Sequence, residues 1–306
     1  MTIAVIMPSY NGAAYLGAQL DSIRHQTRPP SQVLIRDDGS GDATNLMLNR
    51  WAKDWSAIRV VEDEHSHLGV TASIQQLLKV TADQTDVPLI ALADQDDVWL
   101  PEKLEWAEAW HREVGDDQPA LYCAGANLAG QNMEPLGRAP VWRKPMGLRN
   151  ALVENMALGC TTVINRKALD LLVGEWPKSV IAHDWWAYLV IAAHGGLMHY
   201  DERPVLNYRQ HGRNAIGYLP SVAGRWRRRL GRLFGGSMPP LFAQARGLLS
   251  QYGDAMSPEA RAVVDEFLGL SDGWQRLRAL IQPVGERQRL LDNIALRLLI
   301  AGGSIK

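Results

Sequence analysis

The segment Leu89-Ile90-Ala91-Leu92-Ala93-Asp94-Gln95-Asp96-Asp97-Val98-Trp99 places three carboxylates within four residues directly after a short apolar run. The length and composition of that run are typical of a buried β-strand. Further strand-like runs occur at Ile3–Met7, Gln32–Arg36 and Ile58–Val61. Helical spacing of apolar residues is found at Ala13–His25, Asp42–Trp55, Val70–Val80 and Pro101–Val114. This alternation predicts an α/β fold in which helices cover a parallel sheet.

Polar residues gather where the predicted strands end. The three loops are Pro8-Ser9-Tyr10-Asn11, Asp37-Asp38-Gly39-Ser40 and Asp94-Gln95-Asp96-Asp97. In open α/β sheets, ligands bind in the crevice at the carboxyl ends of the strands. We therefore expect the functional site to be built from these loops.

Carboxylates as close together as those of the third loop repel one another unless a positive charge lies among them. A hard divalent cation with oxygen ligands meets that need, and Mg²⁺ commonly shares its shell with substrate phosphates. The alternative is a solvated acidic turn before the helix at Pro101. For Asp37 and Asp38 the alternative is an ordinary turn and helix cap.

Composition narrows the class of protein. The chain has 306 residues, a net charge of −1, 46% hydrophobic residues and two cysteines. These values exclude a disordered chain and a disulfide framework, and no apolar run is long enough to span a bilayer. With no signal-peptide pattern, we expect a cytoplasmic protein that does not bind nucleic acid. Between Arg203 and Gly253 there are nine arginines and no Asp or Glu.

Three segments together resemble the signature of family 2 glycosyltransferases. They are Val5–Gly12, Arg36–Asp42 and Asp94–Leu104, and their order and spacing also fit. The third segment is similar to bacterial rhamnosyltransferase-like members. The resemblance covers about residues 1–217. It implies an inverting enzyme with the GT-A fold, a Rossmann-like mixed sheet flanked by helices, followed here by a C-terminal helical extension.

The resemblance also implies which residues bind a nucleotide-sugar donor. Asp37 or Asp38 is expected to contact the nucleobase, in a pocket lined by Pro8, Ser9 and Asn11. Asp94 and Asp96 match the DxD motif, which holds the ribose and the diphosphate with its Mn²⁺ or Mg²⁺ ion. Asp97 stands beside them as a further expected metal ligand.

The family's general base is an acidic residue that opens a helix in the acceptor half, and Asp184 occupies the matching place. Inversion requires one carboxylate to take the proton of the attacking hydroxyl, and a helix start favours the ionised form. The alternative for Asp184 is a plain helix cap. Trp185 and Trp186 are expected to form a platform for the acceptor sugar. Gly159 and Cys160 are expected to border the acceptor site.

The segment Asn207–Asn214 resembles one that closes over the donor in rhamnosyltransferase-like relatives. We expect Arg209 and Arg213 to pair with diphosphate oxygens and His211 to bind the metal. Residues 221–235 follow as a basic amphipathic helix with an apolar stripe opposite its arginines. Such a helix is suited to an anionic membrane surface, or to packing its stripe on the catalytic domain.

These observations predict a catalytic domain at 1–217, with a nucleotide-binding half at 1–115 and an acceptor half at 116–217. Residues 218–306 form a helical region that is a candidate contact for a membrane or for other copies. Residues 121–165 show only short strand-like pieces, and Leu197–Tyr208 reads as two short strands. The predicted function is transfer of a sugar, with dTDP-L-rhamnose as the favoured donor, to a bacterial surface glycan or its lipid-linked precursor. Two alternatives remain: a nucleotidyltransferase or other enzyme acting on nucleotide sugars, and a non-enzymatic glycan-assembly protein.

Overall fold

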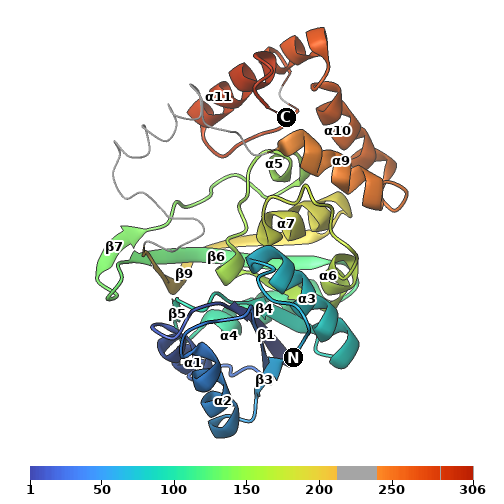
Figure 1. Cartoon of the computed structure of the whole chain (residues 1–306). Coiled ribbons are helices and arrows are strands. Elements are labelled where there is room, and N and C mark those ends of the chain that lie inside the picture. Colours follow the sequence, from blue (N-terminus) through green and yellow to red (C-terminus); the bar gives the residue numbers. More distant parts are fainter. Residues whose placement is uncertain (212–239, 283, 306) are drawn as a thin grey trace. The chain divides into compact units, whose positions relative to one another are not determined.

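The computed structural model describes residues 1–211, 240–282 and 284–305 (Figure 1). Contacts divide the chain into two compact units. Of the described residues, unit 1 contains 1–141, 157–174 and 197–211, and unit 2 contains 142–156, 175–196 and those from Pro240 onward. The predicted acceptor half, 116–217, thus contributes to both units. The predicted boundary between 217 and 218 falls outside the described residues and stays a prediction.

Unit 1 is built on a mixed sheet of nine described strands in the order β3-β2-β1-β4-β8-β6-β9-β5, with β7 paired to β6. The strands are β1 (Ile3–Ser9), β2 (Gln32–Asp37), β3 (Ile58–Val61), β4 (Leu89–Leu92), β5 (Val98–Trp99), β6 (Ala120–Ala129), β7 (Pro135–Arg138), β8 (Val163–Asn165) and β9 (Leu197–Arg209). Strands β1 to β4 run parallel, whereas β8 is antiparallel to both β4 and β6. The predicted mixed α/β sheet is confirmed.

The pairing of β6 with β9 differs from the expectation of short, irregular pieces. These two strands are ten and 13 residues long and run parallel to each other. Nine of the ten residues of β6 are buried, so the strand lacks the alternation of polar and apolar residues that reveals a half-exposed strand. Their register shifts at Gly125, where a Cβ atom would lie 2.9 Å from the carbonyl oxygen of Glu202. Glycine therefore permits this close approach of the two backbones.

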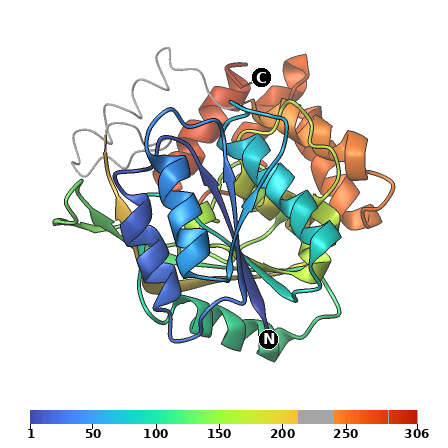
Figure 2. The same ribbon diagram turned by 60° about the horizontal axis from the view of Figure 1, so that its bottom comes forward.

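Helices run alongside the sheet of unit 1 (Figure 2). They are α1 (Leu16–Arg24), α2 (Thr44–Asp54), α3 (Val70–Gln84), α4 (Lys103–Val114), the 3₁₀ turn η1 (Gly159–Thr161) and α6 (Arg166–Leu172). Helix α3 packs on β1 and β2 and buries Ile74, Leu77 and Leu78 at helical spacing. Each such burial contributes about 1.5–3 kcal/mol.

The described part of unit 2 is helical. Its elements are α5 (Leu148–Ala151), α7 (His183–Ala193), α9 (Leu241–Tyr252), α10 (Pro258–Gly269), the 3₁₀ helix η2 (Gly273–Leu280) and α11 (Leu290–Ala301). Every residue of α7 is buried, as expected for a helix that is largely apolar on all sides. The predicted C-terminal helices are thus present. Within the described ranges, no helix combines the length and the hydropathy needed to cross a membrane.

Candidate donor-binding site

A cavity of about 1130 Å³ opens in unit 1 at the carboxyl ends of β1, β2 and β4. Because these strands are parallel, the loops that follow them meet at one edge of the sheet. The cavity brings together seven residues that the sequence predicts for the site: Pro8, Ser9, Asn11, Asp38, Asp94, Asp96 and His211. Its lining is completed by Tyr10, Ala14, Tyr15, His67, Gly69, Val70, Ser73, Gln95, Gln131 and Tyr208.

Gln95 fixes the loop that follows β1. Its Oε1 accepts hydrogen bonds from the hydroxyl of Ser9 and the backbone N–H of Tyr10, and its Nε2 donates to the carbonyl of Tyr10, each at 2.9 Å. Sequence reasoning missed this role, since Gln95 stands between the carboxylates of the DxD motif as its variable position. The sequence feature that could have indicated this role is the position of Gln95 inside the motif.

The two acidic residues at the end of β2 have different surroundings. Asp37 accepts hydrogen bonds from the backbone N–H groups of Gly39 and Ser40 and from the side chain of Asn45, and it does not line the cavity. It therefore stabilises the turn that leads to α2. Asp38 does line the cavity, so of the two predicted nucleobase contacts it is the one the geometry favours.

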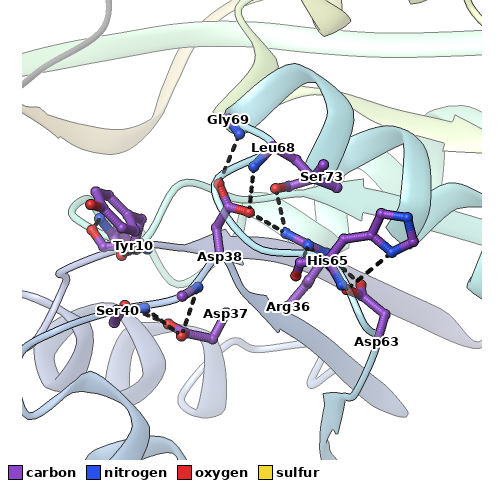
Figure 3. A network of polar contacts seen from close by, with 12 residues as sticks. Tyr10, Arg36, Asp37, Asp38, Ser40, Asp63, His65, Leu68, Gly69 and Ser73 are labelled. Carbon is purple, nitrogen blue, oxygen red and sulfur yellow. Dashed lines mark hydrogen bonds and ion pairs between the residues drawn. The ribbon is translucent and has the colours of Figure 1, made fainter.

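The Asp38 carboxylate belongs to a buried polar network (Figure 3). Its Oδ1 accepts hydrogen bonds from Nη1 of Arg36 at 2.7 Å and from the N–H of Leu68 at 2.9 Å. Its Oδ2 accepts from the N–H of Gly69 at 2.8 Å. Burial alone would raise the pKa of Asp38, but these hydrogen bonds hold it below its ordinary value. The carboxylate is thus ionised and able only to accept.

Asp96 and His211 form a second polar pair on the cavity wall. Nε2 of His211 lies 2.7 Å from Oδ2 of Asp96, and the imidazole stacks on the ring of Tyr15 with centroids 4.9 Å apart. The stacking holds the imidazole in place beside the carboxylate. Two side chains that the sequence predicts as metal ligands therefore meet, although 115 positions separate them in the chain.

Arg209 is buried and does not line the cavity. Its Nε donates to the carbonyl of Asp96 at 2.7 Å, and its Nη1 donates to the carbonyl of Gln131. Its backbone N–H donates to Oδ1 of Asp97 at 3.1 Å. The structure places Arg209 as a support of the acidic loop, whereas the sequence predicts a contact with the diphosphate.

Asp97 is fully buried in unit 1, close to Asp94 and Cys160. One ligand atom from each of these three residues lies within 4.8 Å of the others. Burial, and then the charges of Asp94 and Asp96, raise the pKa of Asp97 well above its ordinary value. Burial likewise raises the pKa of the Cys160 thiol. A neutral thiol is a poor ligand for Mg²⁺ or Mn²⁺, so the residues that suit a hard cation are the carboxylates.

Three residues that face the cavity are of types that bind divalent cations. Asp94, Asp96 and His211 offer oxygen and nitrogen ligand atoms on the cavity wall. Oxygen-rich sites of this kind suit Mg²⁺, and Mn²⁺ also accepts imidazole. Asp97 does not line the cavity.

The predicted acceptor residues lie in two places. Asp184 is buried in the first turn of α7 in unit 2, where its Oδ1 accepts from the N–H of Trp185. The indole N–H of Trp185 donates to the carbonyl of Ala151 at 2.6 Å, and Trp186 is fully buried. In this structure Trp186 therefore offers no ring face to a sugar, contrary to the expectation of a platform. Gly159 and Cys160 are buried in unit 1.

Two further predictions fall outside the described residues. Arg213 and the basic helix at 221–235 belong to residues 212–239. Their expected roles, phosphate binding and membrane contact, stay predictions.

Comparison with known proteins identifies the family. The model of the family described as "Glycosyl transferase family 2" matches residues 4–172, more than half of the chain. The chain therefore belongs to glycosyl transferase family 2, and it is a glycosyltransferase. This agrees with the resemblance carried by the three signature segments.

Two curated relatives are similar to this chain over part of its length. The dTDP-rhamnosyl transferase RfbG of Shigella flexneri is 26% identical over 238 residues, which cover 72% of this chain and 77% of RfbG. WfgD of Escherichia coli, a UDP-Glc:alpha-D-GlcNAc-diphosphoundecaprenol beta-1,3-glucosyltransferase, is 30% identical over 167 residues, or 55% of this chain and 61% of WfgD.

Solved structures show the same fold. The S. aureus TarS 1–349 structure in complex with UDP-GlcNAc aligns with a TM-score of 0.53 at 16% identity and covers 99% of this chain and 93% of that chain. The mannosyltransferase PcManGT from Pyrobaculum calidifontis, in complex with GDP-Man and Mn²⁺, has a TM-score of 0.50 at 22% identity and covers 98% of this chain and 85% of that chain. The predicted GT-A fold is confirmed.

Proposed function

We propose that the protein transfers a sugar from a nucleotide-diphosphate donor to a hydroxyl of a bacterial glycan, with inversion at the anomeric carbon. One observation carries this proposal. A single cavity is lined both by the ionised acceptor Asp38 and by the proposed metal ligands Asp94, Asp96 and His211. A nucleotide diphosphate needs both features, because its base carries N–H donors and its diphosphate needs positive charge.

Asp94, Asp96 and His211 would hold Mg²⁺ or Mn²⁺, and Arg209 would keep the Asp96 backbone in place. When bound, such an ion stabilises the negative charge of the departing diphosphate. The PcManGT complex contains Mn²⁺, which supports a divalent metal in this fold. Tyr15 contributes by holding the His211 ring through stacking.

Asp184 is the proposed general base. As the acceptor oxygen bonds to the anomeric carbon, the bond between that carbon and the diphosphate oxygen breaks. The acceptor proton passes to the Asp184 carboxylate, and the nucleoside diphosphate leaves with the bonding electrons. Asp184 lies in the first turn of α7, as the resemblance implies for the general base.

The proposed donor is dTDP-L-rhamnose, and the proposed acceptor is a growing surface glycan or its lipid-linked precursor. The similarity to RfbG supports the donor. The lipid diphosphate in the name of WfgD supports a lipid-linked acceptor. We further propose that the enzyme acts at the cytoplasmic face of the bacterial membrane.

Incubation with a panel of nucleotide sugars, with and without Mn²⁺ or Mg²⁺, tests this function. We expect metal-dependent binding and slow hydrolysis of one donor, with dTDP-L-rhamnose preferred. Absence of metal-dependent binding for every donor would overturn the proposal. Preference for a UDP-sugar would support a glycosyltransferase and would contradict dTDP-L-rhamnose as its donor.

A further inference from the structure

We propose that Arg36 and Asp63 are positioning residues for nucleobase recognition. They fix the Asp38 carboxylate so that one of its acceptor positions remains for an N–H group of the base. This inference rests on the proposed function, because it assigns a role to residues around the nucleotide site.

Arg36 is fully buried, and all five of its N–H donors have acceptors (Figure 3). Nε and Nη2 form a fork with the two oxygens of Asp63, at 2.6 and 3.1 Å. Nη2 also reaches the carbonyl of His65 at 2.8 Å, while Nη1 donates to Asp38 at 2.7 Å and to the hydroxyl of Ser73 at 2.8 Å. The guanidinium is therefore held in one orientation. Lysine, with a single nitrogen, cannot reproduce this set of contacts.

Asp63 locks that orientation from the segment between β3 and α3. The hydrogen bond from Arg36 is the main reason that the pKa of Asp63 lies below its ordinary value. Its Oδ1 also accepts from the N–H of His65 at 2.8 Å, which ties the carboxylate to its own turn. Asp63 does not line the cavity, so its effect on a ligand passes through Arg36.

The Asp38 carboxylate is fixed in place by Arg36 and by two backbone N–H groups. Among the described residues, three N–H groups donate to its carboxylate, from Arg36, Leu68 and Gly69. A carboxylate offers about four acceptor positions, so one remains, on the Oδ2 atom. Because Arg36 keeps the group ionised, Asp38 accepts and does not donate. A base edge with a ring N–H, as in uracil or thymine, is complementary to it, whereas the ring N3 of cytosine is itself an acceptor.

The test compares the binding of UDP and CDP, at constant Mg²⁺, to the wild type and to Asp63→Asn. The Asp63 side chain is 25% exposed, so the amide fits without burying a new charge. We expect UDP to bind about tenfold more weakly, the size expected for a lost hydrogen bond to a charged group, while CDP binding changes little. The preference for UDP over CDP therefore falls about tenfold.

Glu62→Gln is the matched control, because it makes the same chemical change at the neighbouring exposed position and should leave the preference intact. Arg36→Lys is the second variant. It keeps the charge but loses the fork, and it should lower the preference as Asp63→Asn does. Thermal unfolding of each variant establishes that it is folded.

The outcomes separate the two proposals. An unchanged preference in a variant that is folded overturns the positioning role and leaves the proposed function standing. An equal loss of UDP and CDP affinity also overturns it, because a merely structural role weakens both ligands alike. If the wild type binds neither nucleotide, this inference fails, whereas the proposed function is decided separately by the panel of nucleotide sugars.

Discussion

Replacement of Gln95 by alanine removes the side chain that holds the loop after β1. That loop forms one wall of the cavity, and three hydrogen bonds of 2.9 Å join it to Gln95. We expect the loop to become less ordered in the unbound protein, so that donor binding must order it again. Donor affinity should therefore fall while the fold of unit 1 persists.

The expected loss of donor-binding free energy follows from these three hydrogen bonds. A typical hydrogen bond contributes about 0.5–1.5 kcal/mol, and the two bonds to the exposed Tyr10 backbone lie toward the lower end. Together they amount to about 2 kcal/mol. Since 1.4 kcal/mol corresponds to a factor of ten, the dissociation constant of the donor should rise about thirtyfold.

A second variant displaces the same Gln95 side chain by a steric clash. A Cβ atom at Gly12 would lie 2.1 Å from Oε1 of Gln95, so Gly12→Ala must displace this side chain. Gly41→Ala is the matched control, since its Cβ meets nothing within 4 Å. Calorimetric titration with the preferred nucleoside diphosphate measures the wild type and four variants: Gln95→Ala, Gly12→Ala, their double variant and the control Gly41→Ala. Because both changes disrupt one contact, the double variant should lose about 2 kcal/mol and not the sum. Additive losses, or an unchanged affinity in Gln95→Ala, would refute this reasoning.

Asp184→Asn should reduce transfer by about 10²–10⁴-fold, the contribution typical of a general base, and leave the dissociation constant of the donor within about twofold; loss of donor binding would remove Asp184 from that role. His111 is buried, and burial lowers its pKa to about 4. The unfolded chain binds a proton near pH 6.5, so the free energy of unfolding should fall by about 3 kcal/mol from this group between pH 7 and pH 4. His111→Leu should make that decline correspondingly shallower in urea unfolding at the two pH values, and an equally steep decline would contradict it. Asp96→Asn should abolish the enhancement of donor binding by Mn²⁺, measured by titration, and a retained enhancement would exclude Asp96 as a ligand.

The parallel half of the fold was predictable because its strands are continuous apolar runs bounded by turn residues. Predicted Ile58–Val61 coincides with β3, and predicted Leu89–Ala93 differs from β4 by one residue. Strand β6 was not predictable in this way, because burial on both faces removes the alternation that marks a strand. Its pairing with β9 also depends on a register shift at Gly125, which is a tertiary feature.

The candidate site was predictable in its chemistry and not in its geometry. Successive residues of a strand point to opposite sides, and the sequence does not say whether Asp37 or Asp38 faces the cavity. The contact between Arg36 and Asp63 spans 27 positions, and local pattern carries no information about it. The aromatic character of Trp186 suits a sugar platform and a packed core equally well, and the structure places this residue in the core.

X-ray diffraction from crystals soaked with Mn²⁺ and dTDP, recorded where manganese scatters anomalously, tests the proposed site most directly. We expect one manganese peak bound by carboxylates of the Asp94–Asp96 loop, with the diphosphate on it. The thymine ring should lie beside Asp38, with its N3–H directed at Oδ2. A metal held elsewhere, or a nucleotide outside this cavity, would contradict the proposed site.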